Sequence, residues 1–567
     1  MTNKEIAAVL NDIAMLLELD GENPFKSRAY TNVARQIEGL DGEAAVLARE
    51  GRLREIKGVG DALEQKITEL VTTGKLGYYE ELRAKFPESL FELFKIPGLG
   101  PKRIPQFYTE KGIDSIEKLE LACKDGTFEG MKGIGEKLIE KILEGIEFTK
   151  QFAGRHLFNE AYEEAQAIID LLRAEKSVKR IDTAGSLRRR KEVIGDIDII
   201  CSSAKPEGVM KRFVEYEGVA RITGHGETKS SVVLKNGIAA DLRVVSDAEF
   251  PYALAYFTGS KEHNVVMRQR AKDRGLKLNE YGLYDGEKNI PCKDEADIFK
   301  RLGLPYIPPE MREDMGEFAL DETPELIELG DVIGLIHCHT DYSDGRNTIE
   351  QMARAAHEHG YKYITITDHS QSAAYAGGLR PKTVVKQHAE IDAVAKRVKG
   401  IRILKGIESD ILNDGSLDYP DEILETFDLV VASVHSKLDM DEKEATARVV
   451  KAVEDPYTTI LGHPTGRLLL AREGFPLNYD KVFDACAANG VAIEINANCH
   501  RLDLDWRYVR RARDKGCKLS IGPDAHAIDQ IDNMQYGVGI ARKGWLTKHD
   551  VVNCMTAAQF LKWAGGS

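Results

Sequence analysis

The sequence predicts a multidomain protein with a helical N-terminal part, a mixed α/β centre and a C-terminal part built from repeated βα units. Three observations support this fold class. The chain has 567 residues, which is enough for roughly three to five domains. A Gly-x-Gly motif recurs between helical patterns near the N-terminus, and seven apolar, strand-like runs alternate with helical patterns near the C-terminus.

The N-terminal part contains an internal repeat of helix, tight turn and helix. Its three copies are IKGVGDALEQKI, IPGLGPKRI and MKGIGEKLIEKI, with glycine pairs at Gly58/Gly60, Gly98/Gly100 and Gly133/Gly135. Glycine permits the turn, and the amides that open the next helix can hold a phosphate oxygen. Three copies favour DNA-backbone binding over simple packing. They resemble helix-hairpin-helix elements, which hold the backbone without reading the sequence.

The centre of the chain carries a candidate site for a divalent cation. In GDIDII, Asp196 and Asp198 stand two apart on an extended segment, so their side chains share one face of a strand. The run AADLRVV places Asp241 on another strand, and a sheet can bring this third carboxylate beside the pair. Three carboxylates suit Mg²⁺, which keeps water and substrate phosphate as further ligands.

A phosphate-binding pattern precedes these acids. Gly185 and Ser186 form a predicted turn and are followed by four basic residues at 188–191. Backbone amides, a hydroxyl and guanidinium groups in this order are suited to a triphosphate.

Residues 301–331 have the composition of a linker. They contain two basic side chains, Arg301 and Arg312, against nine acidic ones, together with four prolines. Proline-rich, charged segments of this kind are typical of a linker, and both a flexible and a docked linker fit this composition.

The C-terminal part contains the strongest chemical signal. Its seven apolar runs are GLIHCHT, YITITDHS, ILKGIESDI, LVVASVHS, TILGHP, AIEINAN and LSIGPDAH. Each run ends in a potential metal ligand, in the order His337/His339, His369, Glu408, His435, His463, Glu494 and Asp524/His526. A spacing of about thirty residues is one βα unit and predicts a (βα) barrel or a doubly wound sheet, whose strand ends converge. Imidazole mixed with carboxylate suits Zn²⁺, Mn²⁺ or Fe²⁺.

Composition limits the function classes. The formal charge is 78 − 92 = −14, and residues 301–567 alone hold 31 basic against 41 acidic side chains. Affinity from counterion release grows with the number of phosphates that basic side chains neutralise. A net charge of −14 therefore argues against binding nucleic acid over most of the protein surface, but it allows a local basic groove. The sequence has no CxxC pair, no signal-peptide pattern and no bilayer-length apolar run. We therefore expect a cytoplasmic protein without a membrane partner.

The central residues resemble the family X DNA polymerases, the group that includes DNA polymerase beta. The resemblance is carried by GS followed by RR, by GDID and the later strand Asp, by GETKSS and by YFTGSKEHNVVMRQRAKDRGLKLNEYGL. It implies that Asp196, Asp198 and Asp241 hold two Mg²⁺ (or Mn²⁺) ions. One ion polarises the primer 3′-oxygen and the other assists the departing pyrophosphate.

The same resemblance implies further binding residues. The matched positions are Gly185, Ser186 and Arg189 for the triphosphate, Tyr256, Phe257, Thr258 and Gly259 beside the sugar, Asn264 and Arg268 facing the nascent base pair, and Lys229 near the template backbone.

The N-terminal segments GENPFKSRAYTNVA and GVGDALEQKITELVTTGKL resemble the lyase domain of the family. Lys66 matches the Schiff-base lysine, whose amine attacks an abasic sugar aldehyde when its pKa is lowered. Lys26 and Tyr30 are retained, whereas Phe25 and Ala62 stand where the family usually has a histidine and often has a lysine. The alternative is that Lys66 is an ordinary solvated lysine of a helix.

The histidine-bearing motifs HCHTDYSDG, ITDHS, GIES, VHS, GHP and PDAH resemble the polymerase-and-histidinol-phosphatase (PHP) domain. The implied ligands of up to three Zn²⁺ and/or Mn²⁺ ions are His337, His339, Asp344, His369, Glu408, His435, His463, Asp524 and His526. Such a cluster ionises a water and clamps a phosphodiester for in-line attack. We expect Glu494 to support a ligand, and Asn496 or Asn498 to face the substrate.

The resemblances together imply six segments: a lyase-like helical domain (1–85), a helical DNA-binding domain (86–150), a nucleotidyltransferase palm (151–250), a thumb (251–315), a linker (316–332) and a distorted (βα)7 PHP barrel (333–567). The implied protein is a monomeric DNA polymerase that uses deoxynucleoside triphosphates on gapped or nicked DNA in base-excision repair. Its barrel would act as a 3′–5′ exonuclease and abasic-site endonuclease.

Two alternatives remain open. The barrel is a metal-stabilised scaffold that only positions DNA, or it hydrolyses small phosphomonoesters beside a nucleotidyltransferase that does not act on DNA.

Overall fold

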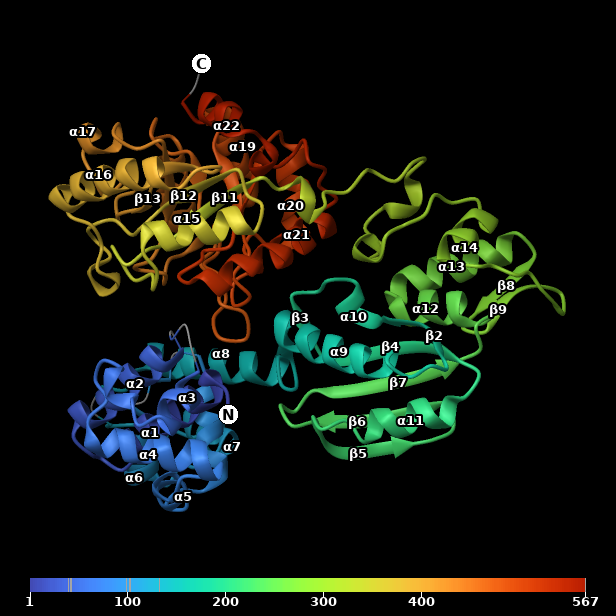
Figure 1. Cartoon of the computed structure of the whole chain (residues 1–567), viewed down its shortest axis with the longest axis horizontal. Helices are drawn as coiled ribbons and strands as arrows, with labels where there is room; N and C mark the ends of the chain where they lie inside the picture. Colours follow the sequence, from blue (N-terminus) through green and yellow to red (C-terminus); the bar gives the residue numbers. More distant parts are fainter. Residues whose placement is uncertain (39, 41–42, 98, 101–102, 132, 566–567) are drawn as a thin grey trace. The chain divides into compact units, whose positions relative to one another are not determined.

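The computed structural model of the protein describes residues 1–567 except 39, 41–42, 98, 101–102, 132 and 566–567. Contacts divide the chain into two compact units, Met1–Ala153 and Gly154–Ser567. Figure 1 shows the chain coloured from the N-terminus to the C-terminus. None of the helices in the described part of the chain is long and apolar enough to cross a bilayer.

The first unit is helical, as the sequence predicts. Its elements are α1 (Asn3–Leu19), α2 (Pro24–Glu38), α3 (Ala44–Arg49), η1 (Leu53–Glu55), α4 (Asp61–Thr73), α5 (Gly77–Arg83), η2 (Glu88–Lys95), α6 (Arg103–Lys111), α7 (Ile116–Lys124) and α8 (Glu136–Gln151). Local chemistry sets the first helix start, where Thr2 and Glu5 form a reciprocal capping box. The apolar faces of the helices meet in one buried core.

Two of the three predicted glycine turns have the expected geometry. Gly58 and Gly133 have φ of 94° and 85°, values that favour glycine. Gly60 and Gly135 then form the N-caps of α4 and α8. Gly100 precedes α6, whereas Gly98 lies outside the described residues. The first residues of α4 and α8, Asp61 and Glu136, are exposed.

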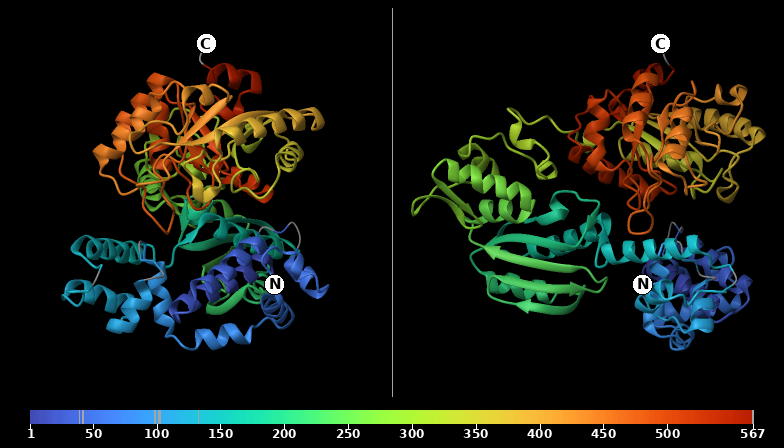
Figure 2. Two further views of the ribbon diagram at one scale, coloured as in Figure 1. Left: turned by 90° about the vertical axis from the view of Figure 1, so that its left-hand side faces the viewer. Right: turned by 180° about the vertical axis from the view of Figure 1, so that it is seen from behind.

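The second unit opens with a five-stranded sheet in the order β2-β4-β7-β6-β5, here called the central sheet. Its elements are β1 (His156–Leu157), α9 (Phe158–Arg173), β2 (Val178–Thr183), α10 (Gly185–Arg188), β3 (Val193–Ile194), β4 (Asp196–Ser203), α11 (Pro206–Val214), β5 (Val219–His225), β6 (Lys229–Leu234) and β7 (Ala239–Val245). Strands β4 and β7 are parallel neighbours, and Asp198 pairs with Asp241 in their register. The green strands of this sheet are seen side by side in Figure 2.

Alternation along β4 places the acids on one face of the central sheet. Ile197, Ile199 and Cys201 point into the core that is shared with α9 and α11. Ile200 points the other way, into a smaller cluster with Phe250. Because side chains alternate with a period of two, Asp196 and Asp198 share the face of Ile200.

The predicted thumb region follows, and its elements are α12 (Phe250–Thr258), α13 (Lys261–Asp273), β8 (Leu276–Asn279), β9 (Gly282–Asp285), β10 (Lys288–Asn289) and α14 (Glu295–Arg301). After it, the predicted linker contains only the short turns η3 (Pro309–Met311), η4 (Glu317–Ala319) and η5 (Leu329–Asp331). This segment is packed rather than solvated, because Glu310, Glu313 and Glu317 are paired with Arg542, Lys543 and His263 respectively.

The C-terminal part is a parallel seven-stranded barrel. Its strands are β11 (Gly334–Cys338), β12 (Tyr363–Ile366), β13 (Arg402–Asp410), β14 (Leu429–Ser433), β15 (Ile460–Leu461), β16 (Ala492–Asn496) and β17 (Leu519–Gly522), in sequence order. A parallel bridge from Cys338 to Ala525, just after β17, nearly closes it. The barrel alternative predicted from the thirty-residue spacing is therefore the correct one, and the doubly wound sheet is excluded.

Helices surround the barrel strands (Figures 1 and 2). The helical elements of this part are α15 (Ile349–Glu358), η6 (Ala374–Ala376), α16 (Pro381–Arg397), α17 (Asp421–Leu424), α18 (Glu442–Val453), α19 (Tyr479–Asn489), α20 (Trp506–Asp514), η7 (Ile528–Asn533), α21 (Met534–Lys543), η8 (Val552–Cys554) and α22 (Ala557–Ala564). Apart from the exposed Arg402 and the half-buried Lys405 in β13, the strand residues are buried, as expected for a parallel sheet covered by helices. Strand order and parallel pairing bring all seven carboxyl ends to one rim.

Candidate functional site

All nine predicted barrel ligands meet at this rim. Glu408 lies within β13 and His337 within β11, whereas the others follow the ends of strands. Three compact sets have ligand atoms that all lie within 4.8 Å of one another: His339, Asp344, His369 and His526; His337, His339 and Asp524; and His369, Glu408 and His435. The ninth residue, His463, joins through Nε2, 2.9 Å from Glu408 Oε1.

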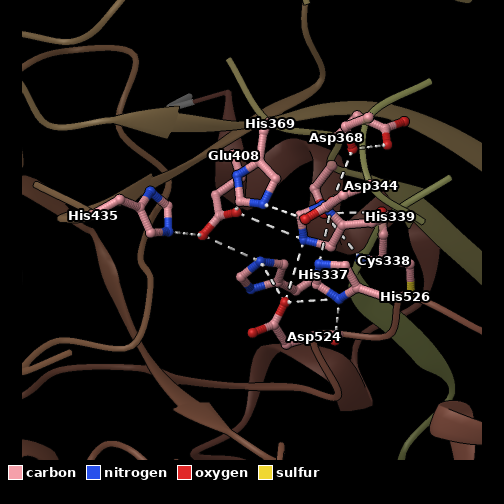
Figure 3. Close-up of polar contacts among 12 residues, drawn as sticks. His337, Cys338, His339, Asp344, Asp368, His369, Glu408, His435, Asp524 and His526 are labelled. Atoms are coloured by element: carbon pink, nitrogen blue, oxygen red, sulfur yellow. Dashed lines mark hydrogen bonds and ion pairs between the residues drawn. The ribbon is translucent and has the colours of Figure 1, made fainter. Parts of the chain in front are cut away.

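Glu408 is at the centre of the cluster (Figure 3). Its Oε1 lies 3.2 Å from His435 Nε2 and 3.5 Å from His337 Nε2, and its Oε2 lies 3.6 Å from His339 Nε2. Asp524 Oδ1 lies 3.3 Å from His339 Nε2. Because the sets share His339 and His369, the cluster has the form of adjoining sites rather than separate ones.

The donor atoms fit metal ions. His337 Nε2, both ring nitrogens of His339, His369 Nδ1 and Glu408 Oε2 are buried and have no hydrogen-bond partner among the described residues. Buried polar atoms are costly unless they are paired. Nitrogen and carboxylate donors of this kind suit Zn²⁺ or Mn²⁺.

Neighbouring carboxylates orient two of the imidazole rings. Glu494 Oε1 accepts from His337 Nδ1 at 2.6 Å, and Asp410 Oδ1 accepts from His435 Nδ1 at 2.6 Å. Each contact turns the opposite ring nitrogen toward the cluster, an arrangement typical of metal-binding histidines. Glu494 therefore has the supporting position expected of it. Sequence reasoning missed Asp410, although it stands two residues after Glu408 in the same strand.

Asp368 is a second buried acid that the sequence did not single out. It accepts hydrogen bonds from Thr340 N (2.7 Å), Ser343 Oγ (2.5 Å) and Gln387 Nε2 (2.6 Å). These contacts fix the loop that carries His339 and Asp344. Its only signal in the sequence was its position directly before His369.

Asn496, one of the two residues predicted to face the substrate, contacts acids of the cluster. It is buried, and its Nδ2 lies 3.2 Å from both Glu494 Oε2 and Asp524 Oδ2. It therefore positions two acids of the cluster. Asn498 is only partly buried, and its Oδ1 accepts from the His500 amide in the turn after β16.

The acids of the cluster are held in the ionised form that a cation needs. Burial alone would raise the pKa of Glu408, but the charges of His435 and His369 hold that pKa well below its usual value. Asp524 behaves in the same way, since His337 and His339 outweigh its burial and lower its pKa. Burial lowers the pKa of His339 to about 3, so its neutral, ligating form is favoured.

Backbone strain is concentrated in the same cluster. His337, His463 and Asp524 have φ of 71°, 21° and 51°, a region that non-glycine residues adopt at a cost. Strained residues of this kind persist where the surrounding structure over-determines them, typically at functional sites.

Two side chains beside the cluster are suited to a nucleic-acid substrate. Tyr375, on the loop after His369, is 73% exposed although it is aromatic. Its ring centroid lies 6.3 Å from that of His369. Arg501 Nε lies 3.6 Å from Asp524 Oδ2 and places a positive charge at the cluster. Neither residue was predicted.

The three predicted acids of the central sheet are also brought together. Asp196 and Asp198 lie on β4 and Asp241 on β7, with Asp198 and Asp241 side by side in the register. Burial, followed by the charges of Asp196 and Asp241, raises the pKa of Asp198 to about 6. Mutual repulsion of this kind is relieved by a bound cation.

Lys229, predicted near the template backbone, contacts one of these acids. Its Nζ lies 2.7 Å from Asp241 Oδ2. Within the described part of the chain, the compact metal-capable sets lie in the barrel and not among these three acids. Phosphate oxygens of a substrate would complete the coordination here, as is usual for Mg²⁺.

The predicted phosphate-binding turn lies directly against the acids. Gly185 has φ of 60°, and a Cβ atom at this position would stand 2.5 Å from Asp198 Oδ2. Ser186 belongs to the same short element, α10. Close backbone approach therefore requires glycine at position 185.

Arg189 leads from this turn to the predicted sugar-binding segment. Its Nη1 donates to Thr258 O at 2.5 Å, and its Nε lies 3.0 Å from Glu313 Oε1. A Cβ atom on Gly259 would stand 3.1 Å from the same guanidinium. The structure thus places Arg189 beside Gly259, but holds it in an ion pair.

The other predicted nucleotide-facing residues gather nearby. Asn264 Nδ2 donates to Tyr256 O at 2.7 Å. Tyr256, Asn264 and Arg268 line one small hollow, and the ring of Phe257 packs edge-on against Tyr256.

Lys66 is held in a cage of aromatic residues within the first unit. Its Nζ donates to Tyr30 Oη at 2.6 Å and lies 3.6 Å from the ring centroid of Tyr78. Burial, followed by the charge of Lys26, lowers the pKa of Lys66. These contacts argue against an ordinary solvated lysine.

Models of known protein families match four segments of the chain. They are a helix-hairpin-helix domain (residues 1–76), a SAM-like helix-hairpin-helix tandem (90–147), the DNA polymerase beta thumb (253–313) and the PHP domain (336–498).

Individual relatives divide in the same way. DNA polymerase lambda of Rattus norvegicus is 26% identical over 46% of this chain and 48% of its own length. A probable phosphatase of a Thermoanaerobacter species is 28% identical over 38% of this chain and 88% of its own length. The DNA polymerase/3′-5′ exonuclease PolX of Bacillus subtilis is 37% identical over 98% of this chain and 97% of its own length. The chain therefore belongs to the PolX family, the family X DNA polymerases that carry a C-terminal PHP domain.

Proposed function

We propose that this protein is a DNA polymerase with a separate metal-dependent 3′–5′ exonuclease site in its barrel. The polymerase assignment is supported most directly by the register of β4 and β7, which sets Asp198 beside Asp241 under the Gly185 turn. The name of the Bacillus subtilis relative, DNA polymerase/3′-5′ exonuclease PolX, contains the same pair of activities. Asp196, Asp198 and Asp241 hold Mg²⁺ or Mn²⁺, which supplies charge stabilisation at the transferred phosphoryl group.

The residues of the chain position the substrates around that centre. Gly185, Ser186 and Arg189 bind the triphosphate, and the segment from Tyr256 to Gly259 packs beside the sugar. Asn264 and Arg268 face the nascent pair, and Lys229 balances Asp241. The glycine turns at 58/60, 98/100 and 133/135 hold the DNA backbone, so that gapped or nicked DNA is the preferred substrate.

The nuclease assignment is supported by the convergence of the nine predicted ligands, eight of them in the compact sets and His463 through Glu408. Buried nitrogen atoms of His337 and His339 have no hydrogen-bond partner among the described residues. Zn²⁺ or Mn²⁺ bound there supplies an ionised water and charge stabilisation for phosphodiester hydrolysis. Glu494 and Asp410 orient His337 and His435, while Arg501 and Tyr375 bind the phosphate and the base of the nucleotide. The same site cleaves at abasic positions, and together the two activities serve base-excision repair.

The first unit adds a deoxyribose-phosphate lyase. The Lys66 amine, desolvated between Tyr30 and Tyr78, attacks C1′ of the abasic sugar and expels its hydroxyl as water to give the Schiff base. Proton abstraction at C2′ then breaks the C3′–O bond by β-elimination, so that the phosphate on the 3′ side of the sugar leaves as the 5′-terminal phosphate of the downstream strand. Water then hydrolyses the Schiff base and frees the Lys66 amine. The lowered pKa of Lys66 supports this role.

A gapped-DNA assay with Mg²⁺ and Mn²⁺ tests the two centres separately. We expect Asp198→Ala to abolish nucleotide insertion while 3′–5′ degradation of the primer continues. We expect His339→Ala to do the reverse. Loss of both activities from either substitution would contradict two independent sites.

A further inference from the structure

An ionic contact joins the barrel to the proposed triphosphate-binding arginine. Glu313, in the segment that connects the predicted thumb to the barrel, has Oε1 3.0 Å from Arg189 Nε and 2.6 Å from Lys543 Nζ. Its Oε2 lies 3.5 Å from Lys191 Nζ. All these residues belong to the same compact unit. The Glu313 carboxylate thus contacts three cations: Arg189 and Lys191, which follow the phosphate-binding turn, and Lys543 from the barrel.

Lys543 is the last residue of α21 and is fully buried. Besides Glu313, its Nζ donates to the main-chain oxygen of Arg189 at 3.0 Å and lies 4.3 Å from the Trp506 ring centroid. Burying a lysine is expensive unless it is paired, and here burial lowers the pKa of Lys543 to about 8. Lys543, a barrel residue, therefore contacts both the main chain of Arg189 and Glu313, the ion-pair partner of Arg189.

The surrounding junction is firmly packed. Glu192 Oε2 accepts from Trp506 Nε1 at 2.8 Å, and the Phe158 and Tyr536 rings meet edge to face at 5.8 Å. The first contact connects the segment after the phosphate-binding turn to α20, and the second connects α9 to α21. They fix the distance between Lys543 and Arg189.

Backbone conformation indicates the same constraint. Arg190, Asp314 and Trp545 have φ of 56°, 57° and 62°. Each stands within two residues of one member of the ionic contact. Positive φ in non-glycine residues is maintained only where neighbouring structure imposes it.

We propose that Lys543 is a positioning residue for nucleotide insertion, through which the nuclease barrel prepares the polymerase centre for the triphosphate. Lys543 Nζ shares Glu313 Oε1 with Arg189 Nε and so weakens the ion pair that holds Arg189. The inference rests on the proposed role of Arg189 in binding the triphosphate.

Charge balance gives the expected direction. With Lys543 present, one carboxylate faces three cations, and the excess positive charge favours a triphosphate. Without Lys543, Glu313 is shared by Arg189 and Lys191 only, so its attraction for Arg189 is stronger. Triphosphate binding must then compete with that ion pair.

Steady-state insertion on gapped DNA by the full-length protein tests the proposal. We expect Lys543→Met to raise the KM for the deoxynucleoside triphosphate at least about threefold, the lower range of coupling between groups in one ionic network. We expect Glu313→Gln to lower that KM, and the double variant to match Glu313→Gln alone. Lys515→Met alters a half-buried barrel lysine that is paired with Asp484 and Asp480; it is the matched control and should leave KM unchanged.

Several outcomes would overturn the inference. They are an unchanged KM in Lys543→Met, a raised KM in Glu313→Gln, or a double variant whose change is the product of the two single changes. The Glu313→Gln result stands by itself if Lys543→Met does not fold, which nuclease activity and thermal unfolding report.

Arg189→Ala separates this inference from the proposed function. If that substitution leaves the KM unchanged, the assigned role of Arg189 is wrong and the inference falls with it. If it raises the KM while Lys543→Met does not, Arg189 binds the triphosphate without help from the barrel, and only the inference fails.

Discussion

At the scale of single residues, the barrel site combines buried ligands with one exposed aromatic ring. Surface tyrosines need no explanation when they are scattered, but Tyr375 stands beside His369 at the rim where the ligands converge. Bases stack on such rings without sequence preference. The ring therefore offers a physical reason for a polynucleotide substrate rather than a small phosphate ester.

We predict that Tyr375→Ala raises the KM for an oligodeoxynucleotide in the exonuclease reaction about tenfold, because stacking contributes about 1–3 kcal/mol per base. The value of kcat should change little, since the metal ligands remain in place. Tyr375→Phe keeps the ring and should behave as the unaltered protein. Equal losses in the two variants would assign the effect to the hydroxyl instead.

Lys66 gives a prediction about pH. Its pKa lies below 10.5 because of burial and the charge of Lys26, so the reactive neutral amine becomes available below pH 10.5. Lys26→Gln removes the like charge and should raise the pKa of Lys66, which moves the rising limb of the pH–rate profile to higher pH. The rate of borohydride trapping on 5′-deoxyribose-phosphate DNA measures this limb. A limb unmoved by Lys26→Gln, or trapping that persists in Lys66→Ala, would contradict the assignment.

Sequence reasoning at this scale found residues that lie within recognisable motifs and missed those defined by contacts. Eight of the nine predicted barrel ligands end strand-like runs at a regular spacing, whereas Asp344 was implied only by the resemblance to the PHP domain. Asp410 and Asp368 stand near ligands but have roles that depend on which atom faces the cluster. The pairing of Glu313 with Lys543 joins residues 230 apart, and no local pattern contains that information.

At the scale of elements, periodicity predicted strands better than it predicted connections. The alternation in β4 correctly placed Asp196 and Asp198 on one face, and the thirty-residue spacing gave the barrel strands in order. For the acidic segment at 301–331 the sequence left open a flexible or a docked linker, and the structure has it docked. Its acids find buried arginine, lysine and histidine partners elsewhere in the same unit, and composition alone cannot reveal such partners.

The clearest energetic consequence of this docking concerns Arg312. It is 1% exposed, and its Nη1 lies 2.6 Å from Glu295 Oε1, while Arg188 Nη2 lies 2.7 Å from Glu295 Oε2. The contact joins the docked segment to α14 and α10. Burial alone would raise the pKa of Glu295, but Arg312 and Arg188 lower that pKa to about 2.

We predict that Arg312→Met lowers the free energy of unfolding of residues 154–567 by about 3–5 kcal/mol, the usual cost of breaking a buried ion pair on one side. Urea denaturation of the full chain measures the change. Arg301→Met, which alters an exposed arginine of α14, is the control and should remain within about 0.5 kcal/mol. A loss as small as the control's would show that the Arg312–Glu295 contact contributes little.

At the scale of the whole molecule, the acidic charge and the two-unit organisation have separate consequences. Part of the negative charge lies in the metal-capable sets of the barrel and part in paired acids of the docked segment. The three compact metal-capable sets found among the described residues all belong to the second unit. Metal occupancy should therefore stabilise one unit and not the other.

We predict that chelation lowers the melting temperature of residues 154–567 and leaves that of residues 1–153 unchanged. A ligand that binds only the folded state stabilises it by about 2.7 kcal/mol at 100 times its Kd, and removing ions from the barrel also leaves buried His337, His339 and Glu408 atoms unpaired. Scanning calorimetry of the full chain with and without chelator measures both transitions. The His339→Ala variant should melt at a lower temperature before chelation and respond less to it, because two of the three sets share that imidazole. A shift in the transition of the first unit, or none in either, would contradict a metal centre confined to the barrel.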